Sequence, residues 1–103
     1  GETSYIKQNV TIPASAHHLV YWQWIVSDDP CDYSGMAEVF IKDTRVDFYD
    51  LCTVTSTQGW VSHSIDLTDY AGQSVWLRIG VIAVGYNFSN LYIDDVSLEA
   101  SAP

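Results

Sequence analysis

Ten residues, HLVYWQWIVS at positions 18–27, alternate two sets of large side chains along the chain. Successive side chains of a β-strand point to opposite faces, so an alternation with a period of two residues predicts a strand. Periodicity alone leaves open which of the two sets faces the core. The first set is Leu19, Tyr21, Gln23 and Ile25, and the second set is Val20, Trp22, Trp24 and Val26.

The same alternation continues on both sides of this segment, and no stretch longer than about one turn has the spacing of a helix. Segments rich in β-branched and aromatic residues alternate with residues typical of turns, which predicts seven strands. Residues 66–72 are expected to form a single capped turn. The expected strands are residues 5–12, 18–27, 36–42, 45–51, 60–66, 74–83 and 89–99.

The last expected strand changes phase along its length. Leu91 and Ile93 share one face, whereas the apolar residues that follow continue this face one residue late. One extra residue at Asp94 and Asp95 accounts for the shift, which predicts a β-bulge at this position.

Composition and charge restrict the classes of protein to which the chain can belong. With 103 residues, 48% of them hydrophobic, the chain suffices for one core, and we expect a single β-sandwich module over residues 1–103. The net charge of −9 repels nucleic-acid phosphates and anionic lipids, and it leaves cations, neutral sugars and basic proteins as partners. The longest apolar run, residues 19–26, is much shorter than the roughly 20 residues of a membrane span, so no membrane insertion is expected.

Cys31 and Cys52 are the only cysteines, and they lie 21 positions apart without the spacing of a zinc or thioredoxin-like site. We expect a disulfide, which stabilises a fold by about 3 kcal/mol and persists outside the cytosol. The glycosylation sequons at Asn9 and Asn87 are usable only in a glycosylating secretory pathway. The chain begins at Gly1 without a signal segment, so we expect a processed or truncated start. The expected disulfide indicates an extracellular or cell-surface location.

Several short motifs together resemble one known family. They are QNVTIPA at 8–14, LVYWQWI at 19–25, GWV at 59–61, IDL at 65–67, YAGQ at 70–73 and IDDVSL at 93–98. Together they are similar to the galactose-binding-like jelly-roll modules, which include MAM-type domains and many carbohydrate-binding modules of bacterial extracellular proteins. The resemblance covers nearly the whole chain and implies a jelly-roll β-sandwich of two antiparallel sheets. This fold hosts glycan binders, protein binders and inert spacers.

The chain departs from that family at its start. Relatives usually open with two additional strands, which would lie at sheet edges beside residues 89–99 and 74–83. Without them we expect two long unpaired edges, which are a template for pairing with another chain. Three interpretations remain open: the chain is a fragment, residues 1–6 are rearranged, or another subunit donates a strand.

The resemblance also implies a candidate glycan site. In the family, segments 19–26 and 74–83 are neighbours in one sheet, with the first set of the opening alternation in the core. This arrangement turns Trp22, Trp24 and Trp76 outward together, and flat aromatic rings stack on the apolar faces of sugars. The alternative is that Trp22 and Trp24 pack in the core while a neighbouring strand or subunit covers Trp76. The polar residues expected to orient sugar hydroxyls are Arg78, Gln23 and Tyr33.

Asp94 and Asp95 at the bulge are candidate ligands of a structural calcium ion, with Glu2, Glu99 or backbone carbonyls completing the site. The family uses an aspartate of this motif together with an acidic residue of its first strand. That strand is missing here, which counts against calcium. A second acidic group surrounds the cysteines and is expected to be a solvated loop; it contains Asp28, Asp29, Asp32 and Asp50.

No catalytic motif is recognisable, so the chain is not expected to be an enzyme. His17, His18 and His63 have no metal-ligand spacing with one another, and no carboxylate pair has a recognisable partner. Trp60 and Tyr70 are expected to close the ends of the sandwich.

The predicted function is a non-catalytic extracellular binding module that recognises a polysaccharide or other glycan, or serves adhesion. The first alternative is a structural subunit that pairs its open edges with copies of itself to form an oligomer or filament. The second alternative is a passive accessory domain of a secreted hydrolase.

Overall fold

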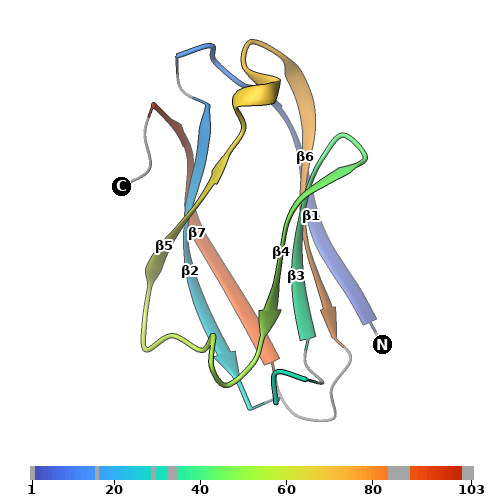
Figure 1. The fold of residues 1–103 in the computed structure, drawn as a ribbon, viewed down its shortest axis with the longest axis vertical. Coiled ribbons are helices and arrows are strands. Elements are labelled where there is room, and N and C mark those ends of the chain that lie inside the picture. The colour runs from blue at the N-terminus through green and yellow to red at the C-terminus, as the bar shows by residue number, and fades with distance from the viewer. Residues whose placement is uncertain (1, 16, 29, 33–34, 84–88, 101–103) are drawn as a thin grey trace.

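The computed structural model consists of two antiparallel β-sheets that face each other (Figure 1). It describes residues 2–15, 17–28, 30–32, 35–83 and 89–100. Within these residues the chain is all-β apart from one turn of 3-10 helix, and the predicted antiparallel β-sandwich is confirmed.

Seven strands and the 3-10 helix η1 (Thr68–Tyr70) are present in the described part of the chain, and η1 lies within the predicted capped turn. The strands are β1 (Glu2–Thr11), β2 (His18–Ser27), β3 (Gly35–Ile41), β4 (Thr44–Leu51), β5 (Val61–Asp66), β6 (Ser74–Ala83) and β7 (Ser89–Glu99). The four-stranded sheet has the order β1-β6-β3-β4, and the three-stranded sheet has the order β5-β2-β7. The largest difference from the predicted bounds is at β1, which begins at Glu2 rather than at residue 5.

The first set of the β2 alternation forms the centre of the core. Tyr21 is fully buried, and Leu19 and Ile25 are almost fully buried, whereas Trp22 and Trp24 are exposed. The alternative in which these two tryptophans pack in the core is therefore wrong. Burial of apolar side chains between the sheets stabilises the fold by about 25 cal/mol for each Å² removed from water. The opposite sheet contributes Val39, Ile41, Val75, Leu77 and Ile79 to the same cluster.

A chain of hydrogen bonds crosses the interior from one sheet to the other. The hydroxyl of Tyr49 on β4 donates to Oε1 of Gln23 at 2.8 Å and lies 2.9 Å from the hydroxyl of Tyr21. Because the Tyr49 proton goes to Gln23, Tyr21 donates to Tyr49. Burial raises the pKa of both phenols, that of Tyr49 to about 12, and keeps them neutral.

Replacing Tyr49 with Phe removes the hydroxyl that joins Tyr21 to Gln23 and leaves two buried polar groups without their partner. We expect the free energy of unfolding at pH 7 to fall by about 1–3 kcal/mol, measured by urea denaturation. The raised pKa of Tyr49 also implies that its contribution is complete below pH 10 and is lost as the pH rises toward 12. In the Tyr49→Phe variant, the free energy of unfolding should lack the part of its decrease between pH 10 and 12 that is due to Tyr49.

Tyr92, which is 48% exposed on β7, provides the control for this change. Tyr92→Phe should alter the free energy of unfolding by less than about 0.5 kcal/mol. An equal decrease in the free energy of unfolding of both variants would show that the buried hydroxyl of Tyr49 stabilises the fold no more than an exposed one.

The sheet neighbours of β2 and β6 differ from the prediction. β2 lies between β5 and β7 in the three-stranded sheet, whereas β6 lies between β1 and β3 in the four-stranded sheet. The expectation that β2 and β6 are neighbours in one sheet is therefore wrong. The predicted open edge at β6 is also wrong, because β1 pairs with β6 along its whole length, from Glu2 opposite Ala83 to Thr11 opposite Ser74. β7 is an edge strand, as predicted, and β1 is the corresponding edge of the other sheet.

The predicted bulge in β7 is confirmed. Trp22 pairs with Asp94 and Val20 pairs with Ser97, so two residues of β7 lie opposite Tyr21 alone. Asp95 takes a left-handed backbone conformation with φ of 51°, which turns the strand at this point.

The predicted disulfide is also confirmed. Cys31 and Cys52 are bonded, with their Cα atoms 5.0 Å apart, and the bond ties the connection before β3 to the end of β4. Such a bond fits a compartment in which thiols are oxidised. None of the helical structure that is described is long and apolar enough to cross a bilayer.

Candidate functional site

Aromatic side chains gather on the outer face of the three-stranded sheet. Trp24 on β2 pairs in register with Tyr92 on β7, and Trp60 lies directly before β5 on the other side of Trp24. The rings of Trp24 and Trp60 meet edge to face, with centroids 5.9 Å apart and an interplanar angle of 75°. These three rings and Val26 line a shallow hollow of about 390 Å³.

Trp22 extends this surface along β2, two residues from Trp24 and on the same face. We call Trp22, Trp24, Trp60 and Tyr92 the aromatic platform. Their exposed fractions are 42%, 37%, 44% and 48%, so each ring offers much of its area to solvent. Large aromatic groups exposed side by side are typical of a binding surface.

Polar groups border the aromatic platform. Ser62 and Asp94 flank Trp22 in register on the two neighbouring strands. The amide of Asn90 donates to the hydroxyl of Tyr92 at 3.2 Å. An apolar floor with a few hydrogen-bonding groups at its rim is the usual composition of a small-ligand site.

Trp76 does not belong to this platform, contrary to the prediction. It lies on β6, on the outer face of the opposite sheet, and it is 50% exposed. The ammonium group of Lys7 lies 4.8 Å from the centre of its ring and partly occupies the ring face. Trp76 points outward as predicted, but it does so from the four-stranded sheet.

The polar residues that were expected to orient a sugar are not beside the platform. Arg78 lies on the four-stranded sheet, where its guanidinium is 4.2 Å from the ring of Phe40 and 5.3 Å from that of Tyr5. Gln23 points inward, is 7% exposed and accepts the hydrogen bond from Tyr49, so its prediction as a surface ligand is wrong. Tyr33 lies outside the described residues.

Asp94 and Asp95 are exposed at the bulge, and the carboxylate of Asp94 accepts a hydrogen bond from the backbone nitrogen of Asp95 at 2.9 Å. Among the described side chains, no third carboxylate or histidine forms a metal-binding group with them. Glu2 is on β1 in the other sheet, and its side chain lies outside the described part. Calcium at this position stays a prediction.

The remaining predicted positions are exposed, half-buried or outside the described residues. Asn9 is exposed on β1, and Asn87 lies outside the described residues. In the acidic group near the disulfide, Asp28 and Asp32 are exposed and Asp50 is half-buried, while Asp29 lies outside the described residues.

Two members of the aromatic platform were missed by sequence reasoning. Trp60 was expected to close an end of the sandwich, but it packs on the outer face against Trp24. Tyr92 alternates outward on β7 and could have been found only with the knowledge that β7 pairs with β2. Tyr70, by contrast, packs against the core from η1, as expected of a residue that closes an end.

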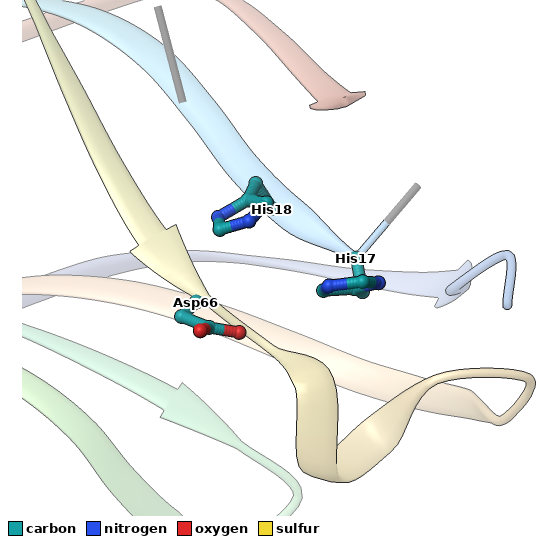
Figure 2. Close-up of side chains that lie close together, drawn as sticks. All are labelled: His17, His18 and Asp66. Atoms are coloured by element: carbon teal, nitrogen blue, oxygen red, sulfur yellow. The ribbon is translucent and has the colours of Figure 1, made fainter. Parts of the chain in front are cut away.

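A second cluster lies at the other end of the same sheet. Figure 2 shows His17 and His18 at the start of β2 and Asp66 at the end of β5. One ligand atom from each residue can be chosen so that all lie within 4.8 Å of one another. The histidines have no metal-ligand spacing in the sequence, but the pairing of β2 with β5 places Asp66 opposite His18.

Comparison of the chain with protein-family models, curated proteins and solved structures finds no match.

Proposed function

We propose that the chain is a non-catalytic binding module, acting outside the cytosol, that recognises a glycan with the aromatic platform. The observation that carries this proposal is the pair of exposed rings of Trp24 and Trp60, which with Tyr92 line one hollow. The carbon-bound hydrogens of a sugar ring form an apolar face that stacks on such rings. The polar groups at the rim are positioned to bond the hydroxyls at the edge of the sugar.

The charge of the chain favours a neutral glycan. A net charge of −9 repels sulfated or carboxylated polysaccharides, and Asp94 adds a negative group beside Trp22 on the platform itself. A neutral polysaccharide avoids this repulsion and retains the stacking and hydrogen bonds.

Replacing Trp24 with Ala removes the ring that meets Trp60 edge to face and pairs in register with Tyr92, and all three residues line the hollow. We expect the dissociation constant for a neutral polysaccharide to rise at least about 30-fold, because a central aromatic residue of a binding site contributes about 2 kcal/mol or more. Affinity electrophoresis in gels with different embedded neutral polysaccharides measures this change.

Trp76→Ala is the matched control, because it removes an exposed tryptophan from the opposite face, where 50% of Trp76 is accessible against 37% of Trp24. It should leave the dissociation constant unchanged. A similar loss of affinity in both variants would contradict the proposal. So would the absence of retardation of the natural sequence by any neutral polysaccharide.

A second candidate function is assembly with copies of the chain through the open edges of the sandwich. β1 and β7 are the edges on one side, and an apolar groove runs between them. Hollows of about 80, 280 and 190 Å³ follow this groove. An edge strand offers unpaired backbone groups to an added strand, and the groove offers pockets for its side chains. Residues lining the groove include Ile6, Leu77, Ile79, Ile93 and Val96.

Val96→Lys places a charge in the groove and on the edge strand, which is a common way to prevent strand addition. If the chain assembles through this edge, light scattering after size exclusion should show oligomers of the natural sequence and monomers of the variant. Val54→Lys, at an apolar position 84% exposed in the loop after β4, should leave the assembly intact. Monomers alone at all concentrations of the natural sequence would exclude this function and leave glycan binding untouched.

Calcium at Asp94 and Asp95 remains part of the proposal as a structural ion. Millimolar Ca²⁺ should then raise the melting temperature, and EGTA should reverse the rise. Asp94→Asn should remove the response, while Asp43→Asn, in the exposed turn between β3 and β4, should keep it. A melting temperature indifferent to Ca²⁺ would eliminate the ion.

A further inference from the structure

The cluster of His17, His18 and Asp66 is held together by the backbone (Figure 2). His18 and Asp66 are register partners on β2 and β5, so their side chains share the outer face of the sheet. The backbone nitrogen of Leu67 donates to the carbonyl of His17 at 2.7 Å, which fixes the residue before β2 against the end of β5. The two imidazole rings lie with their centroids 5.1 Å apart.

The ring of His17 carries an unsatisfied polar atom. Its Nδ1 is shielded from solvent and has no hydrogen-bond partner among the described residues. Leaving a buried polar atom unpaired is costly, and native structures avoid it unless a water, an ion or a functional role accounts for it. The atom belongs to the same three-residue group whose ligand atoms converge.

The carboxylate of Asp66 is oriented by its own neighbours. One oxygen, Oδ1, accepts hydrogen bonds from the backbone nitrogen of Thr68 at 2.8 Å and from the Thr68 hydroxyl. These bonds hold the pKa of Asp66 below its ordinary value, which keeps the group ionised. Hydrogen bonds of this kind position the ligating carboxylates of metal sites.

We propose that His17, His18 and Asp66 bind a divalent transition-metal ion, of which Zn²⁺ is the representative. Two imidazole nitrogens and one carboxylate oxygen are a common set of protein ligands for zinc, and the fourth position is left to water or another donor. Calcium is not expected here, because it takes six or more oxygen ligands. The only two cysteines form the disulfide, so no thiolate competes for the ion.

The ion would need only small side-chain movements. Zinc bonds of about 2.0–2.2 Å in a tetrahedral site place ligand atoms about 3.4 Å apart. The corresponding atoms are within 4.8 Å, and His17 and His18 are only half-buried while Asp66 is exposed. Rotation of these side chains can close the difference.

Bound zinc would join the connection between β1 and β2 to the end of β5 next to η1. Because the ion would bind the folded state and find no assembled site in the unfolded chain, it would stabilise the fold. At a free Zn²⁺ concentration of about 100 times the dissociation constant, we expect the melting temperature to rise by about 10 °C.

The test uses the disulfide-bonded chain without an affinity tag, titrated with ZnCl₂ in a calorimeter and melted with and without Zn²⁺. We expect one Zn²⁺ per chain, and we expect His17→Ala and Asp66→Asn to abolish binding and the rise in melting temperature. His63→Ala and Asp69→Asn are matched controls elsewhere on the chain and should retain both. No saturable binding by the natural sequence, or equal binding by His17→Ala, would overturn the proposal.

Two measurements on the natural sequence keep the test independent of how the variants fold. Co²⁺ in place of Zn²⁺ should give the intense visible absorption of a four-coordinate ion. In NMR spectra, Zn²⁺ should shift the imidazole resonances of His17 and His18 and leave those of His63 in place. Shifts of His63 alone, or only the weak absorption of six-coordinate Co²⁺, would contradict the proposed site.

Discussion

The packing of β2 against the four-stranded sheet is the constraint on which the other features depend. Tyr21 is fully buried between the sheets, and its hydroxyl is bonded to Tyr49, which also holds Gln23. With these residues fixed inward, the two-residue period of the strand forces Trp22 and Trp24 outward. A shift of register by one residue would bury the tryptophans and expose the tyrosine network, so the core and the aromatic platform are determined by the same contacts.

The two outer faces of the sandwich use aromatic side chains in different ways. On the four-stranded sheet, three of the four basic residues of the chain lie over aromatic rings: Lys7 over Trp76, Arg45 over Phe48, and Arg78 between Tyr5 and Phe40. Such contacts occupy ring faces and pair the rings with fixed charges. Among the described residues, none of these cation contacts involves the aromatic platform. In the described part of the chain, the rings of the three-stranded sheet therefore carry no cation over their faces, which supports the proposal that this sheet binds an uncharged ligand.

Local features were predictable from the sequence, and neighbour relations were not. The strands and the bulge at Asp94 and Asp95 follow from alternation, which is a property of consecutive residues. Alternation also divides β2 into two faces, but the outward direction of Trp22 and Trp24 was implied only by the family resemblance. Alternation carries no information about which strand lies beside which, so the neighbours of β2 were taken from the family resemblance, and this placed Trp76 in the wrong sheet. Trp60 was not connected with Trp24 for the same reason. The proximity of His17 and His18 to Asp66 could not be predicted for the same reason, because it depends on the register of β2 with β5. The disulfide was an exception only because two cysteines allow a single pairing.

The open edge of β7 and the aromatic platform belong to the same sheet, which bears on how the two proposed functions relate. A strand added beside β7 would continue the three-stranded sheet next to Tyr92 without covering the outer face, because sheet hydrogen bonds run in the plane of the sheet. Two copies paired antiparallel through β7 would form a symmetric dimer and present two aromatic platforms on one continuous surface. A polysaccharide repeats its binding unit along the chain, so two linked platforms would bind it with a higher effective affinity than either alone. Assembly through this edge would thus reinforce glycan binding rather than compete with it.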